Sequence, residues 1–94
     1  GVVKIADLRL SIWIENVHYA GMGTRAYMAP ELLFDHYKYD FSVDIWANGC
    51  IITEMMTGVP IFHKPKSSYE QQLKVILSIL GTPSEGEWQV FLIL

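Results

Sequence analysis

The segment from Ser42 to Thr57 constrains the fold most, because its apolar side chains surround most of the axis of a predicted helix. Ser42 followed by acidic Asp44 is a favourable helix start, and Gly58 and Pro60 end the pattern. A helix that is apolar on nearly every side must be buried by other elements. The sequence therefore predicts a buried helix, with apolar residues Val43, Ile45, Trp46, Ile51, Ile52, Met55 and Met56.

The chain is short for a fold built around such a helix. Its 94 residues make one domain at most, and a chain of this size buries only a modest fraction of its surface on folding. Apolar residues make up 51% of the chain and the mean hydropathy is +0.24, values typical of a segment from the interior of a larger domain. We therefore expect the chain on its own to be marginally stable.

The residues around Asp7 predict two short strands. The first is a β-branched run, and in the second apolar residues alternate with others, as on a pleated strand. Residues 15–23 carry glycines and little periodicity, which is typical of a loop. The strand residues are Val2, Val3 and Ile5 before Asp7, and Leu8, Leu10, Ile12 and Ile14 after it.

Further helices are predicted on both sides of the buried one. Pro30 suits the first turn of a short helix that ends at Phe34, before a polar connection over residues 35–40. A helix from Tyr69 to Leu80, capped by Ser67 or Ser68, has one apolar stripe, and Gly81-Thr82-Pro83 ends it. Residues 84–87 open a further short helix that holds Trp88, and the apolar residues 91–94 end the sequence within an element.

Three motifs follow one another in a fixed order. They are Lys4-Ile5-Ala6-Asp7-Leu8, then Gly23-Thr24-Arg25-Ala26-Tyr27-Met28-Ala29-Pro30-Glu31, then Asp44-Ile45-Trp46-Ala47-Asn48-Gly49. Together they resemble the C-terminal lobe of a eukaryotic protein kinase catalytic domain, and the resemblance covers nearly the whole chain. It implies a protein-kinase-like α+β fold, here a mostly α-helical part with two short N-terminal strands and the activation segment.

The resemblance also implies a division of the chain and a group of kinases. Residues 1–31 match the metal-binding turn and the activation segment, and residues 32–94 match a helical portion of the C-terminal lobe. The run from Leu80 to Pro83 after an apolar helix resembles the mitogen-activated and cyclin-dependent kinases, and residues 30–46 also resemble the casein kinase 2 alpha subunit. Met28 departs from this group, which usually has a basic residue there.

Asp7 is the metal-binding and cofactor-binding residue that the resemblance implies. In the family this aspartate binds the Mg²⁺ that bridges the phosphates of ATP, and a carboxylate is a hard oxygen ligand suited to that ion. Arg9 stands where the family has glycine, which can adopt positive φ without strain. A cation at this position can pair with Asp7 and compete with Mg²⁺.

Thr24, Arg25 and Tyr27 match the platform that presents the protein substrate in the family. Thr24 is also a catalytic candidate, because the family threonine holds this platform against the catalytic loop. Arg25 is expected either to read an acidic or phosphorylated group or to be a solvated or locally paired surface charge. Tyr19 and Ser11 are candidate phosphorylation sites, with an ordinary loop role as the alternative.

Glu31, Asp44, Trp46 and Gly49 are structural residues by the same resemblance. The glutamate pairs with an arginine of a later helix in the family, and the aspartate is buried where it anchors the catalytic loop. Trp46 is expected to be a large packing anchor, and Gly49 to allow a close approach to its helix.

The implied function is a protein serine/threonine kinase domain fragment, which in the intact family protein transfers phosphate from ATP to protein Ser or Thr with Mg²⁺. The sequence contains no Gly-rich phosphate loop, Val-Ala-Ile-Lys strand or His-Arg-Asp loop, so this chain alone is expected to be inactive. The alternative is a catalytically inactive, pseudokinase-type module that binds other proteins. An unrelated small helical domain would require these ordered motifs to coincide by chance.

Charge and composition point to protein partners. A net charge of −3 and a pI near 5.5 predict neither nucleic-acid nor membrane binding, so protein substrates and regulatory proteins are expected. The lone Cys50 fits an intracellular protein of the cytoplasm or nucleus. No zinc site is predicted, because the three histidines, His18, His36 and His63, are scattered without metal-ligand spacing. The longest apolar stretch is too short to span a bilayer.

Overall fold

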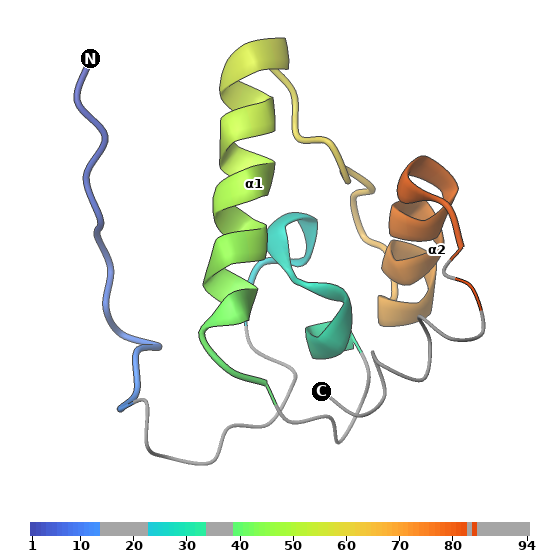
Figure 1. The fold of residues 1–94 in the computed structure, drawn as a ribbon, viewed down its shortest axis with the longest axis horizontal. Coiled ribbons are helices and arrows are strands. Elements are labelled where there is room, and N and C mark those ends of the chain that lie inside the picture. The colour runs from blue at the N-terminus through green and yellow to red at the C-terminus, as the bar shows by residue number, and fades with distance from the viewer. Residues whose placement is uncertain (14–22, 34–38, 83, 85–94) are drawn as a thin grey trace.

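The computed structural model describes residues 1–13, 23–33, 39–82 and 84. Its elements follow in the order η1 (Arg25–Tyr27), η2 (Pro30–Leu33), α1 (Ser42–Thr57) and α2 (Tyr69–Leu80). The first two are short 3₁₀-helices, and they lie between the two α-helices (Figure 1). The α2 helix packs against η2 and η1, and α1 packs against η1.

The α1 helix has the bounds that the sequence predicts. At its start the backbone N–H of Ser42 donates to Asp40 Oδ1 over 2.9 Å. At its end Gly58 adopts a left-handed conformation with φ 82°, and its N–H donates to the carbonyl of Glu54 over 2.7 Å. These local signals fix the two ends of the helix.

The α2 helix also matches its predicted bounds, and Ser68 is its cap. The Ser68 hydroxyl accepts from the N–H of Gln71 over 3.2 Å, while Gln71 Oε1 accepts from the N–H of Ser68 over 3.0 Å. This reciprocal pair is a capping box, which satisfies two backbone donors at the start of the helix.

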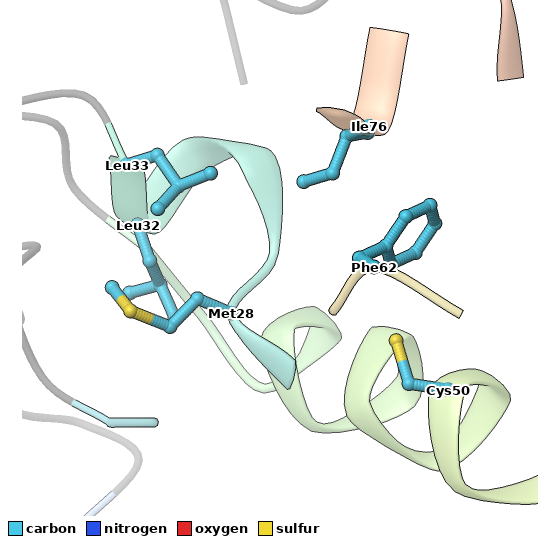
Figure 2. Close-up of a cluster of buried hydrophobic side chains, with 6 residues drawn as sticks. All are labelled: Met28, Leu32, Leu33, Cys50, Phe62 and Ile76. Atoms are coloured by element: carbon cyan, nitrogen blue, oxygen red, sulfur yellow. The ribbon is translucent and has the colours of Figure 1, made fainter. Parts of the chain in front are cut away.

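One cluster of buried side chains joins the elements. Figure 2 shows the side chains of this cluster, which come from the η1–η2 region, α1, the connection after α1, and α2. Met28, in the position where the kinase group that the sequence resembles usually has a basic residue, is 2% exposed, so an apolar side chain suits its surroundings. The members of this core cluster are Met28, Leu32, Leu33, Cys50, Phe62 and Ile76.

The predicted burial of α1 is wrong for this chain. Only Cys50 is buried among the α1 residues, whereas Ile45, Met55 and Met56 are 63%, 62% and 82% exposed. The core cluster contacts one side of the helix, and a helix that is apolar all round needs cover on every side. The described part of the chain does not supply that cover.

The two predicted strands flanking Asp7 are absent from residues 1–13, which run as an extended segment with a turn at Arg9 and Leu10 (Figure 1). Val2 and Ile5 are 83% and 94% exposed. A strand forms only when a neighbouring strand pairs with its backbone, and the described residues offer none. The alternating pattern of apolar residues alone is therefore not enough to form a strand.

Several other predictions are tested only in part or not at all. The short helix predicted to end at Phe34 is the 3₁₀-helix η2, and Phe34 itself lies outside the described residues. Almost all of the loop at 15–23, most of the connection at 35–40, Ile14, His18, His36 and the helix holding Trp88 also lie outside them. Among the described helices, none has the length and apolar character needed to cross a membrane.

Candidate functional site

A hollow of about 620 Å³ lies between the N-terminal segment and the region of η1, η2 and α1. Five residues to which the sequence assigns a function or a modification line it: Asp7, Ser11, Thr24, Tyr27 and Asp44. The fold therefore brings together side chains that are up to 37 positions apart in sequence. Asp40 also lines the hollow, with apolar residues that include Ile5, Leu8, Leu10, Met28, Leu32, Phe41 and Val43.

Asp7 has an uncommon backbone conformation for a non-glycine residue. Its φ is 60°, in the left-handed region that non-glycine residues occupy uncommonly and that aspartate tolerates better than most. Strained backbone of this kind is found preferentially at functional sites. Arg9 does not share this conformation, so its replacement of glycine does not force positive φ at its own position.

Arg9 instead forms an ion pair with Asp7. Its Nε lies 3.3 Å from Asp7 Oδ2, and the two side chains are 79% and 60% exposed. The intervening turn is closed by the N–H of Ser11, which donates to the carbonyl of Leu8 over 3.0 Å. The Ser11 hydroxyl donates to the same carbonyl, and Ser11 is exposed, as a modified serine must be.

The donor set suits Mg²⁺ held jointly with a nucleotide, and it does not suit a metal held by protein alone. In the described part of the chain no three His, Cys, Asp or Glu residues are grouped to hold a metal ion. Mg²⁺ commonly uses one or two carboxylates together with water and substrate phosphates. The exposed Asp7 carboxylate can be one such ligand, and Arg9 Nε lies 3.3 Å from its Oδ2.

The predicted substrate platform is held by two long-range contacts. Tyr27 Oη donates to Glu54 Oε1 over 2.7 Å, which links η1 to the last part of α1. The Arg25 guanidinium carbon lies 4.8 Å from the ring centroid of Tyr69, a cation–π contact with the start of α2. Thr24 is exposed, and its carbonyl accepts from the N–H of Tyr27 over 3.0 Å. Arg25 is thus a locally paired cation.

Three groups near this site have shifted pKa values. The hydrogen bond to Glu54 raises the pKa of Tyr27 above 10.0, because an ionised phenol would lose that bond and repel the carboxylate. Hydrogen bonds from Ser42 lower the pKa of Asp40. Burial raises the pKa of the Cys50 thiol.

The predicted structural residues occupy different environments. Glu31 accepts a hydrogen bond of 3.5 Å from the Ser42 hydroxyl, and it forms no ion pair within the described residues. Trp46 stacks on Phe62 with ring centroids 5.5 Å apart and planes 18° apart. The Trp46 Nε1 is buried, and no hydrogen-bond partner for it lies in the described part of the chain.

Two structural expectations are corrected. Asp44 is exposed and lines the hollow, and the catalytic loop that the resemblance expects to bury it is absent from this sequence. Gly49 is exposed, and a Cβ built on it would meet no atom of another element within 4 Å in the described chain. The predicted close approach to α1 at this glycine is therefore not made here.

Four contacts involve residues that the sequence did not single out as site residues. Glu54 and Tyr69 position the platform from 27 and 44 residues away. Buried Gln72 donates to the Phe62 carbonyl over 2.8 Å and accepts from the Ser67 hydroxyl over 3.2 Å. A glutamine inside an apolar helix stripe is the one local signal, whereas the other partners depend on the tertiary fold. Tyr19 lies outside the described residues.

Comparisons with known proteins find a matching family model and several relatives. A family model described as "Protein kinase domain" matches residues 1–91. The chain is 41% identical over 92 residues to "Cyclin-dependent kinase 20" of Rattus norvegicus, covering 94% of this chain and 26% of the relative. It is 40% identical over 84 residues to "Mitogen-activated protein kinase HOG1B" of Wallemia ichthyophaga, covering 88% and 22%. The chain thus spans about a quarter of the length of the curated relatives it matches.

Proposed function

The chain belongs to the protein kinase domain family, within the group of cyclin-dependent and mitogen-activated kinases, and we propose that it is part of an active protein serine/threonine kinase. The reaction is phosphate transfer from ATP to a serine or threonine hydroxyl of a protein. The observation that carries this proposal is the hollow shared by Asp7, Thr24 and Asp44. Each of three separate motifs of the sequence contributes at least one polar side chain to that hollow.

Within this chain, Asp7 is the residue that would hold Mg²⁺ and, through it, the phosphates of ATP. When bound, the metal neutralises charge on the transferred phosphoryl group. The left-handed backbone at Asp7 supports a specialised role for this carboxylate. Residues 1–31 form the metal-binding turn and activation segment in this proposal, and residues 32–94 form a helical part of the C-terminal lobe.

The platform residues position the protein substrate. Tyr27 is tied to α1 through Glu54, and Arg25 is tied to α2 through Tyr69, so η1 is held at both sides. Phosphoryl transfer depends on holding the reacting groups in line, and a fixed platform contributes to that alignment. Thr24 lies next to these contacts and faces the hollow as one of its lining residues. We assign it the role of orienting the platform toward the catalytic centre.

The proposed partners are protein substrates and regulatory proteins, and the proposed location is intracellular, in the cytoplasm or the nucleus. The names of the related proteins, cyclin-dependent kinase 20 and mitogen-activated protein kinase HOG1B, support protein partners of this kind. The acidic net charge of −3 gives no support to nucleic acid as a partner.

A second candidate function is an inactive module that binds other proteins. The observation that favours it is the ion pair between Arg9 and Asp7, since it occupies the carboxylate that the kinase reaction needs for its metal. The two functions differ in whether any protein that carries this chain transfers phosphate.

The test measures transfer of labelled phosphate from ATP to protein and peptide substrates. We expect transfer by the complete protein that contains this chain and none by residues 1–94 alone, which hold only one of the proposed catalytic groups for the phosphates. Asp7→Asn in the complete protein should abolish transfer, with Glu70→Gln on exposed α2 as the matched control. Activity of the complete protein that survives Asp7→Asn would contradict the role of Asp7, and an inactive complete protein would favour the second function.

A further inference from the structure

The ion pair between Asp7 and Arg9 is set by the local chain rather than by burial. Both side chains are more than half exposed, yet Nε and Oδ2 lie 3.3 Å apart. Arg9 is the second residue of the turn that the Ser11 N–H closes onto the Leu8 carbonyl. The turn keeps Arg9 close to a carboxylate two residues earlier in the chain, without help from any other element.

The hollow contains two other carboxylates with which Asp7 can be compared. Asp40 and Asp44 also line it, and in the described part of the chain neither carboxylate forms an ion pair. Asp40 is engaged by the backbone N–H of Ser42, which is neutral. Of the three carboxylates in the hollow, the one that the kinase proposal assigns to the metal is the one that already has a cation.

We propose that Arg9 is a built-in counter-cation of Asp7, which lowers the affinity of this carboxylate for divalent metal ions. The inference rests on the proposed function, which makes Asp7 the metal ligand. The guanidinium occupies Oδ2, so a metal ion must either displace Arg9 or share the carboxylate with a positive charge close by. Arginine stays charged at every physiological pH, so this competition does not depend on pH.

The size of the effect follows from the exposure of the pair. Exposed ion pairs change equilibria by a factor of about two to five, and salt screens them. We therefore expect Arg9 to raise the metal concentration needed at Asp7 by about two- to five-fold at low salt. The difference should nearly vanish at about 1 M salt, where charges are screened within a few ångströms.

The most informative variant is Arg9→Gln, which removes the charge and keeps an unbranched polar side chain. Arg9→Gly is a poorer choice because glycine also loosens the backbone of the turn. Arg9→Lys keeps a positive charge while losing the planar guanidinium, so it should lie between the wild type and Arg9→Gln. Mn²⁺ serves as the probe, because it shares the preference of Mg²⁺ for oxygen ligands and broadens nuclear resonances near its binding site.

The first experiment records amide spectra of the complete protein that contains this chain, at low salt and with small additions of Mn²⁺. Broadening at Asp7 should be about two- to five-fold stronger in Arg9→Gln than in wild type, while broadening at Asp44 stays the same. Equal broadening at Asp7 in the two proteins overturns the inference.

The second experiment measures how ATP binding depends on Mg²⁺ in the complete protein that contains this chain. The Mg²⁺ concentration for half-maximal ATP binding should fall by about two- to five-fold in Arg9→Gln. If ATP binds equally well at all Mg²⁺ concentrations in both proteins, the inference is overturned and the kinase proposal stands. If neither protein binds ATP but the Mn²⁺ result is as expected, the kinase proposal fails and the competition between Arg9 and the metal stands.

Discussion

The bond between Tyr27 and Glu54 joins two residues that lie 27 positions apart, and it couples the proposed substrate platform to α1. A hydrogen bond to a charged acceptor is stronger than one between neutral groups, and here it is half-buried. Neither residue looks special in isolation, since a tyrosine in a loop and a glutamate in a helix are common. Their pairing shows that α1 supports the platform with a polar contact as well as with the core cluster.

This contact makes a prediction about pH. Glu54→Gln should lower the pKa of Tyr27 toward 10.0, because the hydrogen bond to Glu54 is the main cause of its increase. The raised pKa means that the contact stabilises the fold fully below the unfolded-state pKa near 10 and that this contribution is lost as the pH rises through the folded-state value. Tyrosine ring resonances followed through a pH titration provide the measurement.

Glu70→Gln is the matched control for that titration, because Glu70 pairs with Lys74 on the exposed side of α2. It should leave the Tyr27 titration unchanged. A Tyr27 pKa that is the same in wild type and Glu54→Gln would show that the hydrogen bond is absent in solution.

At the scale of elements, the sequence predicts helices well and the N-terminal segment poorly. The ends of α1 and α2 depend on neighbours in the chain, such as Gly58 with positive φ and the Ser68–Gln71 capping box. Strand formation around Asp7 depends on a pairing partner elsewhere, which no local pattern reveals. The burial of α1 likewise depends on what surrounds it, so its exposed Ile45 and Met56 could not be foreseen.

The residues of the candidate site also fall into two groups, those that sequence motifs predict and those that only the tertiary fold brings in. The motif order identifies Asp7, Thr24 and Asp44, and the fold brings them to one hollow. The contacts made by Glu54 and Tyr69 come from the tertiary arrangement, which the sequence does not specify residue by residue.

The capping box of α2 gives a prediction at this scale. Ser68→Ala should destabilise α2 by about 1 kcal/mol, since it removes the acceptor for the Gln71 N–H at the start of the helix. The expected result is roughly five-fold faster hydrogen exchange of the α2 amides, since local opening controls that rate. Ser78→Ala makes the same chemical change at an exposed position inside the helix and should not accelerate exchange. Similar exchange rates in the two variants would contradict the role of the cap.

At the scale of the whole molecule, many large apolar side chains of the described residues lie exposed outside the core cluster. The cluster contacts one side of α1, and large side chains on the remaining surface are exposed. Exposed apolar patches on this scale mark surfaces that bind other protein. Since the chain spans about a quarter of its relatives, we expect the other parts of a kinase domain to cover this surface in the complete protein.

The isolated chain is therefore predicted to self-associate at micromolar concentration and to unfold without a sharp two-state transition. The double variant Ile52→Gln and Met56→Gln, at positions 54% and 82% exposed, should weaken association about ten-fold without loss of helix content. Sedimentation and circular dichroism provide the two measurements. Ile76→Gln, at a position 2% exposed, is the contrasting variant and should lose helix content. A wild-type monomer with a cooperative thermal transition would contradict the prediction.

The single thiol of the chain lies inside the core cluster, so its reactivity is a probe of the opening of the core. Cys50 is 4% exposed, and burial raises the pKa of its thiol, so the nucleophilic thiolate is both scarce and shielded at neutral pH. An alkylating reagent reaches this thiol when the core cluster opens. The rate at which Cys50 Sγ is alkylated therefore reports how readily the core opens, and no label has to be added to the protein.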